Sequence, residues 1–402
     1  MWLKVRLIYD LLRANRNLTV LLISIVLMEV VHGIELIALL PLYLTEVLGA
    51  TIGLEGAVIS AYMVVDILAR TPAGWVADRL GRKPTLLAGI FLSLISIPLM
   101  MRAQSPHLLL FFNMINGLGA GCIWPAIYAS VADTYGPERR GLILGVINTV
   151  MLGGLGLGPI SGNFVLGLFS YRGAFLVCMT LVALVLLLVL MGTHETSKEQ
   201  RAFAAGWDQE SYAWVNVELA LLGLVAFLLT IGLAFLIPII NLYGLHILRV
   251  TPTRMAFILL VPAIITALML VPAGHLADRT GRKVPMVIGL ALLSICFWGS
   301  PVSINPLVVS SGATLAGIGY ALAVPAWNAL AMDKIPSESR GFLLGVVAAV
   351  QGAGLALGPV IGAHLWERID PYAPFLAAAT VTSIATIVGL FVKDSTPPGP
   401  LR

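Results

Sequence analysis

The stretch Gly74-Trp-Val-Ala-Asp78-Arg79-Leu-Gly81-Arg82-Lys83 occurs twice in this chain of 402 residues. Its second copy begins 200 positions later and reads Gly274-His-Leu-Ala-Asp278-Arg279-Thr-Gly281-Arg282-Lys283. At the same offset Gly117 and Pro125 return as Gly317 and Pro325. One register therefore fits separate segments, which indicates a chain built from two similar halves.

The composition predicts an integral membrane protein. Hydrophobic residues make up 59% of the chain and charged residues only 11%, and the mean hydropathy is +0.96. A water-soluble fold of this length could not hide so much apolar surface. The formal charge of +4 comes from basic residues in short segments between apolar runs, so we interpret it as topological and expect no nucleic-acid partner. Cys122, Cys178 and Cys296 are scattered and show no metal-ligand spacing.

Twelve apolar runs are long enough to cross a bilayer as helices, which predicts an all-α membrane fold. No cleavage site follows the first run, so we expect it to be retained. The runs lie near 18–45, 55–77, 84–103, 107–132, 141–167, 171–192, 215–245, 254–277, 284–303, 306–332, 341–366 and 371–392.

The distribution of basic residues predicts that both termini are cytoplasmic. With that orientation, 18 Lys and Arg residues fall in inside segments and five in outside loops. The expected organisation is an N-terminal six-helix bundle over 1–193, a cytoplasmic linker over 194–214 and a C-terminal six-helix bundle over 215–402. Two parallel halves of this kind suit a transporter with its substrate route between them.

The duplicated loop resembles the signature loop of the major facilitator superfamily, and it falls between spans 2 and 3 and between spans 8 and 9, as in that family. The resemblance covers essentially the whole chain and implies a gate contact that breaks as the halves rock. From the residues alone, we expect Gly74 to let a neighbouring helix approach closely and Asp78 to meet a helix N-terminus. The alternative is a basic loop that only fixes the topology. The candidate gate residues are Gly74, Asp78, Arg79, Gly81, Arg82 and Lys83 with Gly274, Asp278, Arg279, Gly281, Arg282 and Lys283.

A second pattern lies in the fifth span, with Gly145, Gly154, Gly158, Pro159 and Gly162 at near-helical spacing. Such glycines allow close helix packing, and the proline can bend the helix where a gate hinges. In the family this pattern is associated with proton-driven exporters, although Asn163 stands here at its usual last glycine. The spacing recurs in the eleventh span, so a duplicated packing element is the alternative interpretation; its members there include Gly354, Gly358 and Pro359.

Charged residues inside the spans are the candidate proton-coupling and substrate site. Glu29, His32 and Glu35 follow one another at steps of three in span 1, and Asp66 and Arg70 lie one turn apart in span 2. A charge inside the membrane is costly and usually faces a cavity or a partner. We expect Glu29 and Asp66 to carry protons, with His32 and Arg70 as partners. Glu35 ranks lower because it lies nearer the outer surface, where it could be solvated; a purely structural salt-bridge network between spans 1 and 2 is the alternative.

The corresponding positions of the second half carry no ionisable groups, so protonation chemistry is expected in the first half. Drug exporters of the family usually carry an arginine in span 4, where this chain reads Asn113-Met-Ile-Asn116. Short motifs around Glu29, in span 4 and in span 10 instead look like the glycolipid flippases that supply the lipoteichoic-acid anchor. In that branch an arginine stands where His32 falls here. Candidate cavity residues, for which helix packing is the alternative role, are Asn113, Asn116, Trp124, Tyr128, Trp327 and Asn328.

These features predict a secondary transporter that works by alternating access. We expect proton-coupled export or flipping of an amphipathic or lipophilic compound, either a drug, as in multidrug efflux, or a lipid, across a plasma membrane. The expected driving force is a proton gradient with no cofactor, and the expected state is a monomer in the lipid bilayer. A proton symporter or facilitator for a small metabolite is the main alternative. A non-transporting scaffold would have no use for duplicated gates, and no nucleotide loop, metal cluster or nucleophile pattern predicts an enzyme.

Overall fold

The computed structural model describes residues 15–134, 137–195, 217–300, 303–335 and 340–394, although a few side chains within these ranges are not described. Within these ranges the secondary structure is helical and no strand occurs. The predicted linker over 194–214 lies almost entirely outside the described residues.

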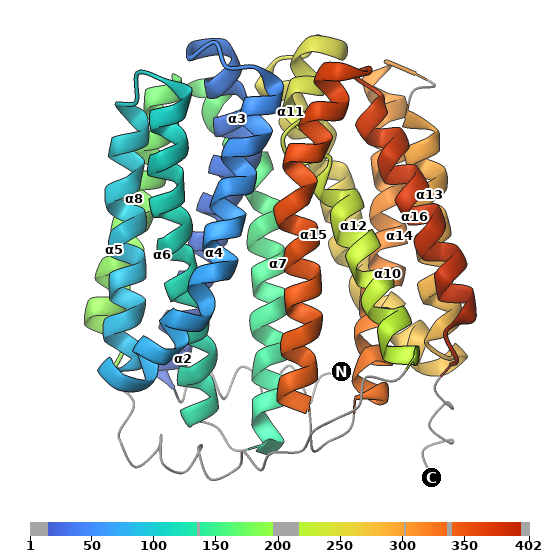
Figure 1. Cartoon of the computed structure of the whole chain (residues 1–402), viewed down its shortest axis with the longest axis horizontal. Coiled ribbons are helices and arrows are strands. Elements are labelled where there is room, and N and C mark those ends of the chain that lie inside the picture. Colours follow the sequence, from blue (N-terminus) through green and yellow to red (C-terminus); the bar gives the residue numbers. More distant parts are fainter. Residues whose placement is uncertain (1–14, 135–136, 196–216, 301–302, 336–339, 395–402) are drawn as a thin grey trace. The chain divides into compact units, whose positions relative to one another are not determined.

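The helices of the first half follow the predicted spans (Figure 1). The first span is a series of short elements, and the other five are single helices. In chain order they are α2 (Arg16–Gly33), η1 (Ile34–Leu39), α3 (Leu40–Leu42), η2 (Tyr43–Val47), α4 (Ile52–Leu80), α5 (Arg82–Met101), α6 (Pro106–Thr134), α7 (Pro137–Leu168) and α8 (Tyr171–Gly192).

The helices of the second half repeat this order, and again the first span is the interrupted one. In chain order they are α10 (Val217–Ala234), α11 (Ile240–Leu242), η3 (Tyr243–Ile247), α12 (Pro252–Thr280), α13 (Lys283–Trp298), α14 (Pro306–Lys334), α15 (Arg340–Arg368) and α16 (Ala373–Phe391).

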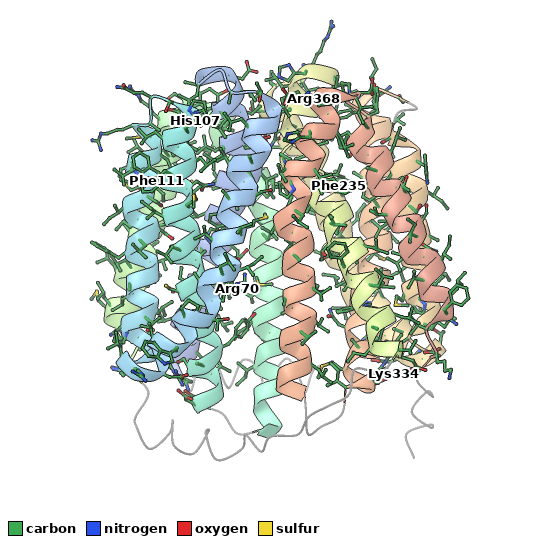
Figure 2. All side chains as sticks on the ribbon, viewed as in Figure 1. Arg70, His107, Phe111, Phe235, Lys334 and Arg368 are labelled. Carbon is green, nitrogen blue, oxygen red and sulfur yellow. The ribbon has the colours of Figure 1, made fainter. Side chains whose placement is uncertain are left out.

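Ten of these helical segments are long and apolar enough to cross a membrane. The two other predicted spans are α13, which is apolar but shorter, and the 32-residue α7, which lies partly among residues whose side chains are not described. Large apolar side chains on the outside of the bundles agree with a lipid environment; Phe111 on α6, for example, is 57% exposed (Figure 2).

The chain forms two compact units, and each has its own helix packing. The first contains Met1–Leu40 and Ala61–Asp208, and the second contains Pro41–Ser60 and Gln209–Arg402. Residues 41–60, which the sequence assigned to the first half, thus group with the second unit, while α4 runs continuously across the boundary. In the first unit α2 packs on α7 and α5 on α6, and in the second unit α10 packs on α15 and α13 on α14 in the same way.

Prolines explain why the first span of each half is irregular. Pro41 and Pro238 have no backbone N–H, and the ring of a proline inside a helix collides with the carbonyl four residues earlier. The helix α10 ends at Ala234, four residues before Pro238. Before Pro41 the chain instead widens into the π-helical turn η1, which carries Glu35. Such turns often occur at functional sites.

Candidate functional site

The polar residues of span 1 are buried in the first unit. Glu29 and His32 are each 6% exposed and Glu35 is 0% exposed. One turn of α2 brings His32 Nδ1 to 3.6 Å from Glu29 Oε1. The three residues that follow one another at steps of three in the sequence therefore form a buried row of polar groups, called the polar row below.

Glu35 has a partner that its position in the sequence did not reveal. Asn116 of α6 donates from Nδ2 to Glu35 Oε2 at 2.9 Å, and both side chains are buried. The expectation that Glu35 could be solvated is therefore wrong. The wider turn of η1 holds this carboxyl within the bundle. Asn116 was predicted as a cavity residue, and the contact places it beside the polar row of span 1.

Asp66 and Arg70 form a bidentate pair on α4. Arg70 Nε lies 3.1 Å from Asp66 Oδ1, and Arg70 Nη2 lies 2.7 Å from Asp66 Oδ2. Two parallel hydrogen bonds of this type are strong and directional. Asp66 is buried, whereas the side chain of Arg70 is partly exposed.

The two polar groups are linked by an aromatic contact and not by an ion pair. The Tyr62 ring on α4 meets the His32 ring edge-on, with centroids 5.9 Å apart. Among the described residues, the ion pairs of these spans lie within one helix each, Glu29 with His32 and Asp66 with Arg70. No ion pair of the described residues therefore joins spans 1 and 2, as the alternative of a structural salt-bridge network would require. Tyr62 is a site residue that the sequence analysis missed, since a tyrosine in an apolar span carries no distinctive signal.

Glycines of α7 fix the position of α2. A Cβ atom at Gly154 would lie 2.7 Å from Glu29 Cβ, and one at Gly158 would lie 2.5 Å from Gly33 Cα. Real Cβ atoms do not approach other atoms so closely, and the two helices can touch only because these positions lack a side chain. Gly162 packs on Ala38 and Ile34 in the same way. The surroundings of Gly145 are not among those described.

The same arrangement holds in the second unit, where α15 packs on α10. Cβ atoms added at Gly354, Gly358 and Gly362 would collide with Thr230, Ala234 and Phe235. The glycine pattern is thus a packing element in both halves. This duplication fits the structural alternative for the pattern at least as well as an exporter-specific role.

Two buried atoms in the polar row have no partner. Within the described part of the chain, neither His32 Nε2 nor Glu35 Oε1 has a hydrogen-bond partner. Such atoms cost free energy when they are shielded from water. A proton or a polar ligand group bound at these atoms would remove this free-energy cost. The polar row is therefore suited to bind a proton or a polar ligand group.

The other predicted cavity residues divide into two groups. Asn113 and Trp124 are buried in α6, where the Trp124 and Tyr128 rings lie with centroids 6.0 Å apart and planes tilted by 32°. Trp327 belongs to the core of the second unit and donates from Nε1 to the Leu222 carbonyl at 2.9 Å. Its observed role is helix packing, which was the alternative given for it. Asn328 is exposed on α14.

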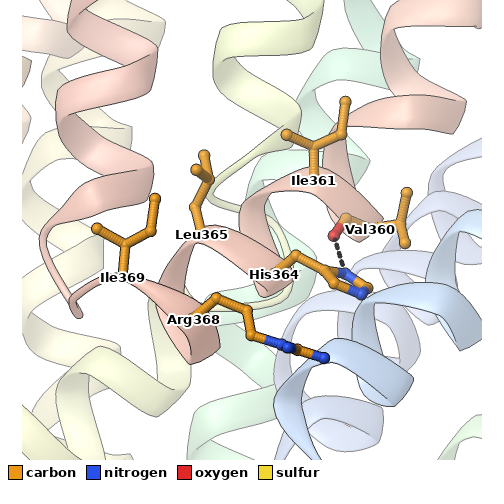
Figure 3. Close-up of a pocket in the computed structure, with 6 residues that line it drawn as sticks. All are labelled: Val360, Ile361, His364, Leu365, Arg368 and Ile369. Carbon is orange, nitrogen blue, oxygen red and sulfur yellow. Dashed lines mark hydrogen bonds between the residues drawn. The ribbon is translucent and has the colours of Figure 1, made fainter.

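A pocket of about 340 Å³ is present in the second unit, but it contains none of the predicted site residues. It is an open groove along the C-terminal turns of α15, as Figure 3 shows. Four aliphatic side chains line it together with His364 and Arg368. His364 Nδ1 lies 2.8 Å from the Val360 carbonyl of the preceding turn, so this ring is turned back onto its own helix.

In each duplicated loop an arginine pairs with a carboxylate at the end of another helix. Arg82 pairs with Asp78 and, through Nε at 2.9 Å, with Asp133 at the end of α6. In the second unit Arg282 pairs with Asp333 at the end of α14. Asp133 and Asp333 differ by the same 200 positions as the loops, and the repeat could have revealed them.

An acidic residue after the last helix of each half completes these loops. Glu195 accepts hydrogen bonds from the backbone N–H groups of Arg82 at 2.8 Å and Lys83 at 2.9 Å, where α5 begins. Asp394 accepts bonds from Arg282 and Lys283 at 3.0 and 3.1 Å. A carboxylate at this place satisfies the free N–H groups of a helix start and opposes its dipole.

Glycines within the loops have two different roles. Gly81 and Gly281 have φ angles of 121° and 91°, which other residues rarely adopt. The expected close helix approach at Gly74 is wrong for the described residues, because a Cβ there would lie 3.9 Å from Pro125, an ordinary contact distance. At Gly274 no described atom lies within 4 Å. Arg79 stacks over the Trp75 ring at 4.0 Å.

The two repeated units and their buried polar row define a multi-pass membrane transporter. The family model of the Major Facilitator Superfamily matches residues 21–246 and 222–402, and the chain therefore belongs to this superfamily. Members of this superfamily are transporters, and the chain is therefore a transporter and not an enzyme. Among the described residues no cluster of three His, Cys, Asp or Glu side chains could hold a metal ion.

Similar proteins come from staphylococci. The chain is 23% identical over 355 residues to the proton-coupled antiporter flippase LtaA of Staphylococcus epidermidis, covering 87% of each chain. It is 24% identical over 360 residues to the LtaA protein of Staphylococcus saprophyticus, covering 88% of each. The crystal structure of the human organic anion transporter MFSD10 (TETRAN) has the same fold, with a TM-score of 0.63 and 19% identity over 93% of this chain and 99% of that one.

Proposed function

We propose that this protein is a proton-coupled antiporter that moves an amphipathic, lipid-like compound across the plasma membrane by alternating access. It acts as a monomer with both termini in the cytoplasm. Its proton site is the polar row Glu29, His32 and Glu35, together with Asp66 and Arg70. The observation that carries the proposal is this buried row, in which two polar atoms have no partner.

The chemistry of the row suits proton transfer. Glu29 and His32 lie 3.6 Å apart, which is longer than a hydrogen bond and leaves room for a proton to change the contact. Asp66 already has a cation, Arg70, at hydrogen-bond distance. Glu29 therefore exchanges protons with His32, while proton binding by Asp66 depends on the position of Arg70. A substrate that draws Arg70 away would leave Asp66 free to bind a proton.

The nature of the cargo rests on the relatives and on the aromatic side chains of α6. The similar staphylococcal proteins are named as flippases, and the neighbouring Trp124 and Tyr128 are amphipathic side chains with an apolar ring and a polar group. These observations favour a lipid over a hydrophobic drug. A glycolipid flippase is the narrower proposal. Its ligand contacts must differ from those of the flippase branch at position 32, where this chain has histidine.

The duplicated elements would supply the movement. The ion pairs of Arg82 with Asp133 and of Arg282 with Asp333 can act as latches that open and close with the transport cycle. Pro159 and Pro359 interrupt the hydrogen bonding of α7 and α15 and can serve as hinges. Both roles are shared by the halves, whereas the proton site belongs to the first half alone.

Transport by reconstituted protein tests the proposal. Proteoliposomes with an imposed pH gradient would be loaded with a fluorescent glycolipid or with a lipophilic cation, and movement of each compound and of protons would be followed. We expect glycolipid movement that depends on the gradient in the wild type. Glu29→Gln should abolish this dependence, because the amide cannot take up a proton. Asp370→Asn, which changes an exposed carboxylate outside the proposed site, should behave like the wild type.

Three outcomes separate the alternatives. Movement of the lipophilic cation alone would assign the protein to drug export. Uptake of a small metabolite together with protons would show a symporter. Glycolipid movement that persists without a gradient, or unchanged in Glu29→Gln, would make the carboxyl structural and the protein a facilitator, and it would refute the proton-coupled proposal.

A further inference from the structure

A second buried carboxyl lies in the first turn of α4 and belongs to none of the features described so far. Glu55 is 0% exposed. Within the described ranges neither of its carboxyl oxygens has a hydrogen-bond partner, and no cation forms an ion pair with it. It lies in the second unit, whereas the proposed proton site lies in the first.

The start of α4 is packed tightly against α15. Cβ atoms at Gly53 and Gly56 would collide with Glu367 and Ala363. Ser60 Oγ accepts a hydrogen bond from the Val360 N–H at 3.0 Å. These contacts tie one face of the first turns of α4 to α15, and Glu55 is buried beside that face.

The N–H groups that could stabilise the Glu55 carboxylate are already used by other residues. A carboxylate in the first turn of a helix is normally stabilised by the free N–H groups there. In α4 the Gly53 N–H donates to Glu367 Oε2 at 2.6 Å, and the Leu54 N–H donates to Thr51 Oγ1 at 3.2 Å. The Glu55 N–H itself bonds to the Thr51 carbonyl at 3.0 Å. Glu55 is thus a carboxyl at a helix start where these three N–H groups are bonded to other atoms.

Other ionisable groups at this end of the second unit have partners of their own. Glu367 caps α4, His364 bonds to its own helix, and Glu46 pairs with His246 at 3.2 Å. The second unit also contains Tyr243, Arg254, Arg368, Asp370 and Tyr372, and none of these side chains makes a hydrogen bond to Glu55.

We propose that Glu55 is a second proton-binding site, which holds a proton while the start of α4 stays buried. An ionised carboxylate without a partner is too costly to bury, whereas the neutral acid is tolerated. The corresponding residue of the second half is the apolar Met255, which is also buried. Release of the proton requires water to reach the carboxyl. Water can enter only if the packing around the first turns of α4 opens, so raising the pH loosens this packing.

Infrared spectroscopy of the reconstituted protein tests the proposal without any transport. A neutral carboxyl gives a C=O stretching band that a carboxylate lacks. At neutral pH we expect this band in the wild type and in Asp370→Asn, and we expect the contribution of one carboxyl to be lost in Glu55→Gln. If the band is as strong in Glu55→Gln as in the wild type, the proposal is overturned. Because the spectrum needs no substrate, this outcome is independent of whether the protein proves to be a proton-coupled transporter.

Hydrogen exchange of residues 51–60 provides a second measurement. Glu55→Gln and Glu55→Met both remove the ionisable group, and Met copies the residue of the other half. At alkaline pH the segment should exchange faster in the wild type than in either variant. The ratio of the wild-type exchange rate to the variant exchange rate should grow by up to about tenfold per pH unit. Equal exchange in the wild type and in a folded variant at every pH overturns the proposal. Comparison at matched pH removes the intrinsic pH dependence of exchange.

Discussion

The crossing of α2 and α7 can be tested by adding single methyl groups to α7. Gly158 and Gly33 touch through their backbones, and a Cβ at Gly158 would lie 2.5 Å from Gly33 Cα. Gly156 lies on the same helix but is exposed, and no described atom would lie within 4 Å of its Cβ. Gly156→Ala is therefore a matched control for Gly158→Ala.

The structure sets the size of the expected difference. Both substitutions replace glycine by alanine within one helix, which favours the helix by about 0.8–1.0 kcal/mol in each case. This gain cancels when the two variants are compared. The remaining difference is the cost of forcing a methyl group into a closed contact, about 1–3 kcal/mol. Gly158→Ala should thus be less stable than Gly156→Ala by about this amount.

Thermal unfolding of the purified variants in one detergent measures the difference. We expect Gly156→Ala to unfold at or above the wild-type temperature and Gly158→Ala to unfold below it. Gly33→Ala should destabilise the protein as well, and the double variant Gly33→Ala/Gly158→Ala should lose less than the sum, since the first methyl group already separates the helices. Equal stability of Gly156→Ala and Gly158→Ala would refute the packing argument.

Two further predictions concern carboxylates with partners. Asn116→Leu leaves Glu35 without its donor and should cost about 1–3 kcal/mol of stability; thermal unfolding should show that Glu35→Leu/Asn116→Leu loses less than the two single variants together. Glu195→Gln weakens the two bonds to the Arg82 and Lys83 N–H groups and should cost about 0.3–1 kcal/mol at low salt. The same unfolding assay should show this loss shrinking as salt is added, and a loss that does not depend on salt would contradict an electrostatic role.

The periodic features of the fold could be predicted from the sequence. The helices start and end near the predicted apolar runs, because a span must be both long and apolar to cross a bilayer. The repeat predicted equivalent loops, and Arg82 and Arg282 do occupy equivalent pairs. The spacing of Glu29 and His32, and that of Asp66 and Arg70, also sufficed to predict neighbours along one helix, since a turn of α-helix fixes which side chains meet.

Contacts between distant segments could not be predicted in the same way. The bond between Asn116 and Glu35 joins α6 to η1, and no local pattern specifies that pairing. The π-helical turn that carries Glu35 depends on how the chain resolves the missing N–H of Pro41. The role of Glu195 is also non-local, because it acts on the start of a helix more than 100 residues earlier. Hydropathy records which segments are buried but not which polar atoms meet there.

The positions that the repeat does not preserve indicate where the chemistry lies. The loops and the glycine crossings recur in both halves, and each copy makes equivalent contacts. By contrast, every residue of the proposed proton site corresponds to a non-ionisable residue 200 positions later. Leu229, Gly232 and Phe235 stand at the positions of Glu29, His32 and Glu35. Thr266 and Leu270 stand at those of Asp66 and Arg70. Asn116, which holds Glu35, corresponds to Ala316, so the partner differs as well as the acid. In the second half, non-ionisable residues at these positions are sufficient for helix packing. The buried polar groups of the first half therefore require another reason for their cost, and proton binding provides one.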